Sequence, residues 1–361
     1  MGWNYVATFT GTWSIANFPT GAVDESGTLW VMYGDEGKNQ ALTYFSHPLP
    51  QNGASFRVDP IPLAQRTTGS PCLMRVRGQL LPMWVEAERP QWLAWGVLDP
   101  ETRSLSQKGL LGYTPDGALA AFFPKTDCLL ATYRGVNKAG SSQEDGRLNS
   151  ATVTGLGTPE PLTYNGTYPL LSGQNINNSY YSPAVAAMPN GDVAVLFKGV
   201  GRPGAANSDD KLYFMSAMWA PDPLNTNFSV ARPVQYPGHG GTSATAVSMN
   251  RPGLALHGTG LAATLVALYP GTVAGQLSYL VGTLNGGGVT WAAPPPNGTV
   301  PLDGLLANAG AGGGAVTLTN PVGVWVTASE ASETLYLLVG DQVDGHIKGP
   351  LYVVRYMGEN S

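Results

Sequence analysis

The sequence has little charge, cysteine or histidine for its length. Only 12% of its 361 residues are charged, the formal net charge is −5, and two cysteines and four histidines are present. The charges form no block of one sign, so we expect no nucleic-acid partner. Cys72 and Cys128 are too few for a disulfide framework and are expected to be buried thiols. The histidines are too scattered for a metal site, and we expect neither metal nor cofactor.

Long apolar segments and helical periodicity are also missing. No apolar run approaches the roughly 20 residues of a membrane span. The start, MGWNYVATFTGT, has neither the charged nor the apolar region of a signal peptide. Apolar residues with helical spacing extend over no more than about two turns, which excludes bundles and wound α/β folds. We expect a soluble all-β protein; whether it is cytoplasmic, or secreted with a signal replaced by Met1, stays open.

What the sequence does have is turns, with 47 glycines and 29 prolines, and a repeated hairpin between them. Residues 181–199, YSPAVAAMPNGDVAVLFKG, form two apolar runs around an Asn-Gly turn. Related pairs of runs occupy residues 20–35, 70–87, 117–135, 243–258 and 313–329. A third strand-like run follows each pair, and a fourth follows in several units. Four strands repeated every 50 to 70 residues or so predict a β-propeller.

We therefore expect one domain over residues 1–361 with six blades, or seven smaller ones as the alternative. The expected blades are residues 20–62, 70–112, 117–163, 181–236, 243–301 and 313–357. Residues 3–13 would supply a closing strand and loop, with NYVATFT pairing beside PLYVVRYM near the C-terminus. Surplus apolar runs leave the strand register of the last two blades open.

The long connections indicate where a ligand would bind. In a four-stranded blade, the loop after the second strand and the loop into the next blade emerge on the same face, and here both kinds are long. The residue at the exit of the second strand is a tyrosine, an arginine, a lysine or a histidine in different blades, a set that can hold a polyhydroxylated or anionic ligand. The candidate ligand-binding residues on this face are Tyr33, Asp35, Arg134, Tyr180, Tyr181, Lys198, His239 and His257.

The segments GHGGTSATAV, GLALHG and QLSYLVGTLNGGGVTW resemble the blade repeat of fucose-lectin and sialidase-like propellers. Within the last segment, Thr283, Asn285, Gly287, Thr290 and Trp291 are similar to a degenerate Asp-box turn, with asparagine in place of the aspartate. Such turns are architectural and imply no catalysis. The resemblance implies a propeller that binds carbohydrate, but the arginine triad of sialidases is not apparent.

Two functions from different classes remain. The first is carbohydrate recognition by a lectin-like propeller. The second is a single-pocket enzyme that acts on a small molecule, because residues at equivalent positions differ between blades. A glycosidase would need two carboxyl groups about 5 to 9.5 Å apart, whereas a lyase or a secondary-metabolite cyclase would work by shape and hydrogen bonding. Catalytic residues are not assigned. The candidates for a glycosidase pair are Asp35, Glu36, Glu86, Glu88, Glu144 and Asp145, and those for an apolar cyclase pocket are Trp13, Met215, Met218 and Trp219.

Overall fold

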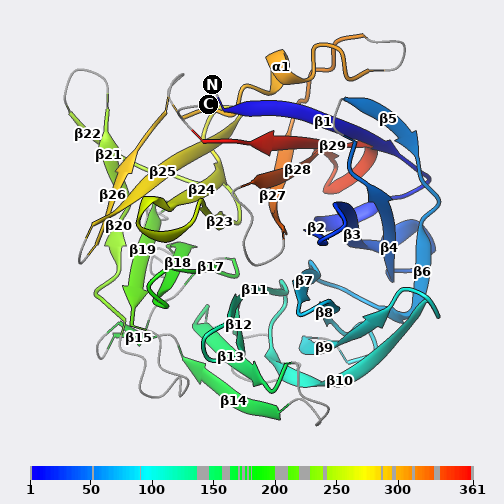
Figure 1. The fold of residues 1–361 in the computed structure, drawn as a ribbon, viewed down its shortest axis with the longest axis horizontal. Helices are drawn as coiled ribbons and strands as arrows, with labels where there is room; N and C mark the ends of the chain where they lie inside the picture. The colour runs from blue at the N-terminus through cyan, green and yellow to red at the C-terminus, as the bar shows by residue number, and fades with distance from the viewer. Residues whose placement is uncertain are drawn as a thin grey trace.

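A computed structural model shows an almost entirely β molecule whose sheets are arranged around a central axis (Figure 1). The structure describes residues 2–50, 53–89, 91–135, 146–156, 163–169, 171–172, 175–176, 179, 181–199, 210–218, 228–238, 242–285, 288–294, 298–310, 314–328 and 334–358. Among these residues, no helix has the length and apolar character needed to cross a membrane. The helical elements are one-turn segments: η1 (Glu36–Lys38), η4 (Gly260–Ala262) and α1 (Leu302–Leu305).

The largest sheet has nine strands and contains both ends of the chain. Its order is β5 (Ala54–Arg57), β1 (Trp3–Thr10), β29 (His346–Tyr356), β28 (Leu335–Val343), β27 (Pro321–Ala328), β2 (Ile15–Val23), β3 (Thr28–Asp35), β4 (Ala41–Pro48) and β6 (Ile61–Arg66). Strand β1 pairs antiparallel with β29, with Trp3 opposite Tyr356. The two termini therefore lie side by side (Figure 1).

Four further sheets contain four antiparallel strands each, and in every one the strands lie side by side in chain order. They consist of β7 (Cys72–Val76), β8 (Gln79–Val85), β9 (Trp92–Asp99) and β10 (Ser104–Tyr113); β11 (Ala118–Phe123), β12 (Cys128–Arg134), β13 (Leu148–Thr154) and β14 (Thr163–Pro169); β17 (Ala184–Ala187), β18 (Val193–Lys198), β19 (Leu212–Ala217) and β20 (Arg232–Pro233); and β23 (Gly253–His257), β24 (Thr264–Pro270), β25 (Leu277–Asn285) and β26 (Gly288–Ala292). Two short pairs join β15 (Leu171–Ser172) to β16 (Asn175–Ile176) and β21 (Gln235–Pro237) to β22 (Ser243–Thr245).

The innermost strands form a ring in which β2, β7, β11, β17, β23 and β27 each contact the next, and β27 contacts β2. The apolar cores lie between successive sheets. Met32 of β3, for example, shares a cluster with Trp84 of β8, and Leu130 of β12 shares one with Val195 of β18. Burial of apolar surface thus holds each sheet against its neighbours rather than filling one central core.

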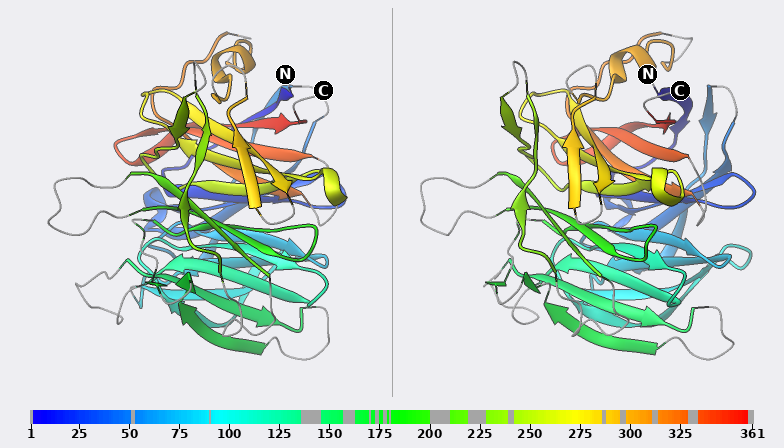
Figure 2. Two further views of the ribbon diagram at one scale, coloured as in Figure 1. Left: turned by 90° about the vertical axis from the view of Figure 1, so that its left-hand side faces the viewer. Right: turned by 60° about the vertical axis from the view of Figure 1, so that its left-hand side comes forward.

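Each inner strand runs between two ends of the molecule, which differ in their connections. At the loop end, chain segments such as residues 114–117 and 246–252 lead into the inner strands. At the turn end, the inner strands pass into the second strands through the connections β11–β12, β17–β18 and β23–β24. In side view, η4 of the β23–β24 connection lies at the turn end, and the strands extend from it across the molecule (Figure 2).

The predicted hairpins of the first two thirds occur as expected, but the last third is shifted. Residues 20–35, 70–87, 117–135 and 181–199 contain β2–β3, β7–β8, β11–β12 and β17–β18. The expected hairpin 243–258 is wrong: β22 pairs with β21, and β23 is an innermost strand that pairs with β24. Pro252, which has no N–H to donate, separates β22 from β23. The expected hairpin 313–329 is also wrong, because β27 pairs with β28 beyond it.

The segment that resembles an Asp-box contributes the connection between β25 and β26. Asn285 Nδ2 donates to Thr290 Oγ1 at 2.7 Å across this connection. Trp291 is buried and makes an edge-to-face contact with Phe214, with ring centroids 5.5 Å apart. These residues anchor the outer edge of one sheet to the next, which is an architectural role; Gly287 lies outside the described residues.

Candidate functional site

Arg134 is at the loop end, where the sequence predicts it, but its guanidinium is engaged inside the protein. It ends β12 and is 9% exposed. Its Nε lies 2.7 Å from one carboxylate oxygen of Asp116 and its Nη2 lies 3.2 Å from the other. Its backbone N–H donates to Ser182 Oγ, which in turn donates to the Gly117 carbonyl. This bidentate ion pair links the end of β12 to the segment that leads into β11.

Lys198 occupies the equivalent position at the end of β18 and is likewise satisfied internally. Its Nζ lies 2.9 Å from a carboxylate oxygen of Asp210 and 5.6 Å from the centre of the Tyr181 ring. Lys198 as a whole is 6% exposed, and its backbone carbonyl accepts a 2.6 Å hydrogen bond from Ser179 Oγ. The structure therefore brings Tyr181 and Lys198 together, as a cation on an aromatic face.

Tyr33 and Asp35 belong to the packing of the first hairpin. Tyr33 is fully buried against Trp13, and burial raises the pKa of its hydroxyl well above the usual range. Asp35 is 1% exposed, accepts the Ser14 backbone N–H at 3.1 Å and lies 3.8 Å from Lys38 Nζ. Both residues support the loop end from within, and neither presents its side chain to a ligand in this structure.

The remaining predicted site residues do not join this group. His257 is a correction: it ends the innermost strand β23 at the turn end, not a second strand, because of the shifted register. Its ring lies 5.0 Å from that of Tyr356. Tyr180 and His239 lie outside the described residues.

Arg251, which sequence reasoning missed, lies at the loop end in the segment that leads into β23. It is 8% exposed, and its Nη2 donates to the Ala118 carbonyl at 3.0 Å. Its Cζ lies 6.0 Å from the centre of the Phe18 ring. Since Phe18 belongs to β2, Ala118 begins β11 and Arg251 precedes β23, the guanidinium connects three parts of the inner ring. An arginine beside a proline in a connecting segment gives no sequence signal of such a contact.

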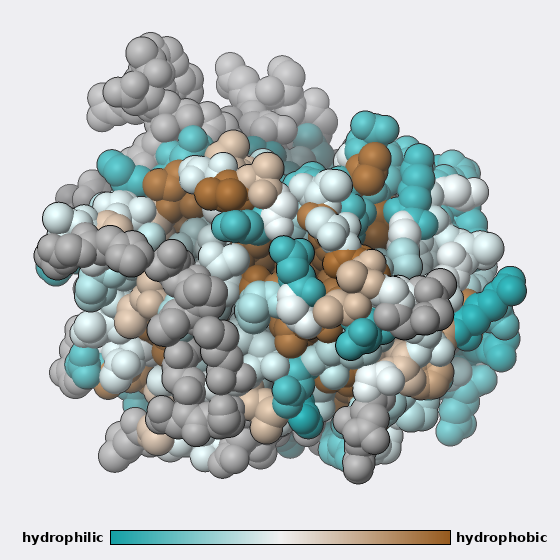
Figure 3. Space-filling model, turned by 90° about the horizontal axis from the view of Figure 1, so that it is seen from above, coloured by the Kyte–Doolittle hydropathy of each residue, from teal (hydrophilic) through white to brown (hydrophobic). Residues whose placement is uncertain are grey.

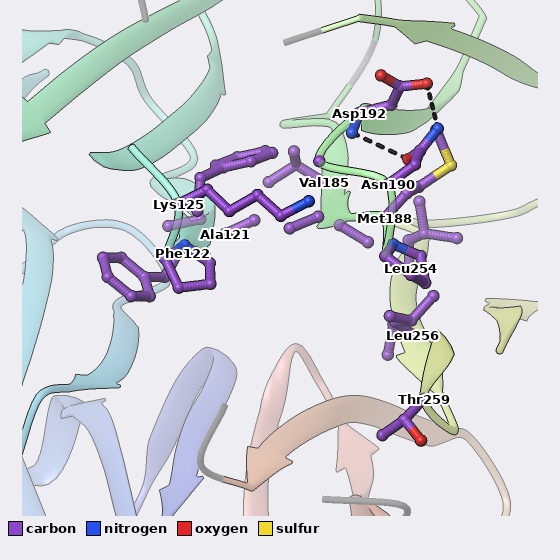
Figure 4. A pocket seen from close by; sticks show the side chains of 18 of the residues that line it. Ala121, Phe122, Lys125, Val185, Met188, Asn190, Asp192, Leu254, Leu256 and Thr259 are labelled. Carbon is purple, nitrogen blue, oxygen red and sulfur yellow. Dashed lines mark hydrogen bonds between the residues drawn. The ribbon is translucent and has the colours of Figure 1, made fainter. Parts of the chain in front are cut away.

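A cavity of about 440 Å³ opens at the turn end, opposite the face that the sequence favours. Inner strands β11, β17 and β23 form its walls, with Met74 of β7 and Met218 at the end of β19 (Figure 4). Most of its lining is apolar and includes Ala121, Phe122, Val185, Met188, Leu254 and Leu256. Its size and lining are those of a small-molecule site. On the outer flank seen in Figure 3, by contrast, hydrophobic surface forms small patches among polar residues.

Some polar groups at the rim of this cavity are paired with protein side chains, and others extend over the cavity. Asn190 and Asp192 bond to each other within the β17–β18 turn, at 2.6 and 3.0 Å. Arg75 Nη2 lies 2.7 Å from Glu25. Lys125 extends from the β11–β12 turn over the cavity, close enough to the next turn that a Cβ on Gly191 would lie 3.9 Å from its Cδ (Figure 4). Within the described residues no ion pair of Lys125 occurs.

The carboxylates and cysteines that could serve catalysis or metal binding are spread over the molecule. Glu86 accepts a hydrogen bond from Gln107 at 2.7 Å, and Glu144 and Asp145 lie outside the described residues. In the part of the chain that is described, no three histidine, cysteine, aspartate or glutamate side chains are grouped to hold a metal ion. Cys72 and Cys128 are buried free thiols, and burial raises their pKa values to about 11 and about 12.

The apolar residues proposed for a cyclase pocket separate in the structure. Met218 lines the cavity at the turn end. Met215 is fully buried between sheets, and Trp13 is buried with its indole N–H donating to the Gly349 carbonyl at 2.9 Å. Trp219 lies outside the described residues.

No protein-family profile matches the sequence, and no curated protein matches it. Solved structures share its fold. An α-L-arabinanase from Penicillium chrysogenum, determined with arabinobiose, superposes with a TM-score of 0.59 at 12% identity, covering 98% of this chain and 97% of that one. A protein of unknown function from Dyadobacter fermentans gives 0.54 at 10% identity, covering 99% and 100%.

A variant of the Aleuria aurantia lectin in complex with Fucα1-6GlcNAc gives a TM-score of 0.50 at 13% identity, covering 95% of this chain and 96% of that one. The chain therefore has a propeller-type fold, and the resemblance of its sequence to lectin-type propellers is confirmed at the level of the fold. Identities this low carry the architecture and not the ligand.

Proposed function

We propose that residues 1–361 form one six-bladed propeller. The ring of six inner strands supports this count, with β27, β28, β29 and β1 forming one blade and β2, β3, β4 and β6 the next. In this arrangement the N-terminal strand closes the last blade. The expected blades 20–62, 70–112, 117–163 and 181–236 keep their inner strands, whereas the fifth and sixth would begin at β23 and β27.

We further propose that the protein recognises one small, largely apolar molecule at the turn end. The single observation that carries this proposal is the cavity of about 440 Å³ with its apolar lining. Its walls come from different inner strands that carry different side chains, so it is a composite pocket and not one copy of a repeated site. A ligand seated there would bury its apolar body against Ala121, Val185 and Leu256.

Lys125 gives this pocket a preference for ligands that carry an anionic group. Its aliphatic stem lies beside the next turn and its ammonium is unpaired within the described residues, while the aspartate at the rim is bonded to Asn190. A cation at the edge of an apolar cavity lies in a lower effective dielectric constant than a fully solvated lysine. Its attraction for an anionic group is therefore stronger.

Titration with N-phenyl-1-naphthylamine, a neutral apolar dye, tests this function. We expect one dye per chain. Leu256→Trp, which places a larger ring in the cavity, should weaken binding at least tenfold, whereas the control Val343→Trp, at a position 53% exposed in β28, should not. Dye binding that both variants leave unchanged would contradict the site.

The single-pocket enzyme considered from the sequence would use the same cavity. A lyase or cyclase that works by shape and orientation needs a dry pocket more than it needs an acid and a base. Native mass spectrometry of a ligand library, followed by chemical analysis of the bound fraction, separates the two cases. A ligand recovered unchanged supports recognition alone, and a ligand recovered as an isomer supports catalysis.

Carbohydrate recognition at the loop end is the second candidate. The cation-on-aromatic pair of Lys198 and Tyr181 favours it, together with the fold shared with a lectin determined with a fucosylated disaccharide. The proposed residues are Arg134, Tyr180, Tyr181, Lys198 and His239, with Tyr33 and Asp35 supporting the loop end from within. A glycan array with calorimetric stoichiometry tests it. Several equivalent sugar sites per chain would establish a lectin, and a blank array would leave the turn-end pocket as the ligand site.

A further inference from the structure

Arg251 lies just before β23, and its side chain extends to contact residues of β11 and β2. Its backbone N–H donates to Asn250 Oδ1 at 2.8 Å, which fixes the start of the side chain. Its Nη2 then bonds to the first carbonyl of β11, and its Cζ lies over Phe18 of β2. The guanidinium thus lies at the loop end of the axis, beside the starts of the inner strands whose other ends line the cavity.

The second guanidinium nitrogen, Nη1, is enclosed. It is buried, and among the described residues it has no hydrogen-bond partner. No ion pair joins Arg251 to a carboxylate among the described residues. Asp116 is the carboxylate whose charge acts on Arg251, yet both of its oxygens lie within 3.2 Å of Arg134 nitrogens. Cys72 also faces Arg251, but burial raises the pKa of its thiol to about 11, so it is neutral at pH 7.

A guanidinium in this position stays charged, although burial lowers its pKa. A buried cation with no counter-charge costs considerable free energy, and an enclosed donor with no acceptor adds to that cost. Both costs fall if a negatively charged acceptor lies beside Nη1. We propose that Arg251 binds a small monovalent anion at the loop end of the axis, a site separate from the turn-end cavity and independent of the function proposed for it.

The enclosure of Nη1 favours a compact anion. Chloride and the carboxylate of formate or acetate share the needed chemistry, a single negative charge that accepts a hydrogen bond. The bound anion would link sheets, because the arginine that holds it already contacts β2 and β11. Anion binding would therefore raise the stability of the folded chain in a saturable manner, by mass action.

Crystals of the full chain grown with sodium bromide in place of chloride give the direct test. We expect an anomalous peak at hydrogen-bonding distance from Arg251 Nη1. In parallel, thermal unfolding is followed at constant ionic strength while chloride, acetate or formate replaces isethionate. The wild type should show a saturable rise in Tm with at least one of the three, and the anion that acts identifies the source of the charge.

Arg251→Met keeps the length of the side chain without its charge and should abolish the anion dependence, whereas Arg251→Lys should retain part of it. Arg232→Met, at an exposed position of β20, is the matched control and should behave as wild type. The absence of a bromide peak together with a flat anion response in the wild type would overturn the proposal. So would an unchanged response in Arg251→Met.

Discussion

The two ends of the central axis are built from the same inner strands but differ in chemistry: one end buries charged groups, and the other carries an open apolar cavity. At the loop end, buried cations contact groups from neighbouring sheets, as Arg134 does with Asp116 and Arg251 does with the Ala118 carbonyl. At the turn end, an apolar cavity stays open and its charged groups lie at the rim. Buried charge holds the sheets together at one end, and unfilled apolar surface offers binding energy at the other. Under the proposed function, stability and ligand recognition are separated along one axis, so that each is expected to respond to different substitutions.

The largest expected effect is on stability at the loop end. Asp116→Asn removes the carboxylate that pairs with Arg134 and acts on Arg251, which leaves two buried guanidinium groups without it. We expect a loss of about 3 kcal/mol in the free energy of unfolding. Urea unfolding measures it, with dye binding at the turn end retained in the folded protein.

Glu25→Gln is the matched change at the turn end. It breaks the pair with Arg75, in which the glutamate side chain is 59% exposed, and should cost no more than about 1 kcal/mol. Equal losses in the free energy of unfolding for Asp116→Asn and Glu25→Gln would contradict the difference proposed between the two ends.

Lys198→Met tests a loop-end residue that the sequence predicts to bind ligand. Its ammonium pairs with Asp210 and covers the Tyr181 ring in the structure. We expect a loss of about 1 kcal/mol, since Asp210 is one third exposed and regains water. Calorimetric Tm measures it, with Lys108→Met on β10 as the control. An unchanged Tm with lost sugar binding would favour the carbohydrate site instead.

Lys125→Ala tests the charge at the rim of the cavity. Binding of the anionic dye 8-anilinonaphthalene-1-sulfonate should weaken about two- to fivefold, the range of a partly exposed charge pair. Binding of the neutral N-phenyl-1-naphthylamine should stay as in wild type. Fluorescence titration of both dyes measures the difference, and equal weakening of the two would show that Lys125 contributes packing and not charge.

The smallest expected effect is a pH dependence at the turn end. Burial opposes ionisation of Asp24, but hydrogen bonds from Ser26, Trp30 and Thr28 outweigh it and lower its pKa. A lowered pKa contributes stability above the unfolded value of about 4, and that contribution is lost as pH falls through the folded value. Asp24→Asn should flatten the decline in Tm below pH 4. A decline as steep as that of wild type would contradict the assignment.

The sequence predicts the fold well where each apolar run has only one partner available. The tight turns of β2–β3 and β17–β18 separate two short runs, so their pairing is unambiguous. In the last third, residues 243–247, 253–257 and 264–270 are all strand-like, and only packing decides that β23 pairs with β24. Local pattern therefore identifies the strands but cannot choose among three adjacent candidates.

The site shows the same limit. Arg134 and Lys198 do end second strands, as their positions in the repeat indicate. Their partners are distant in sequence: Asp116 precedes β11, and Asp210 lies at the far end of the connection between β18 and β19. No local sequence pattern couples either pair. The cavity depends on how the neighbouring inner strands β11, β17 and β23 pack against one another, which is not a property of any one strand alone.

Calorimetric titration of N-phenyl-1-naphthylamine into wild type and Leu256→Trp decides whether the turn end holds one composite ligand site. We expect one site per wild-type chain and binding at least tenfold weaker in the variant. Several equivalent sites per chain, or a single site that the variant binds as tightly as wild type, would contradict it.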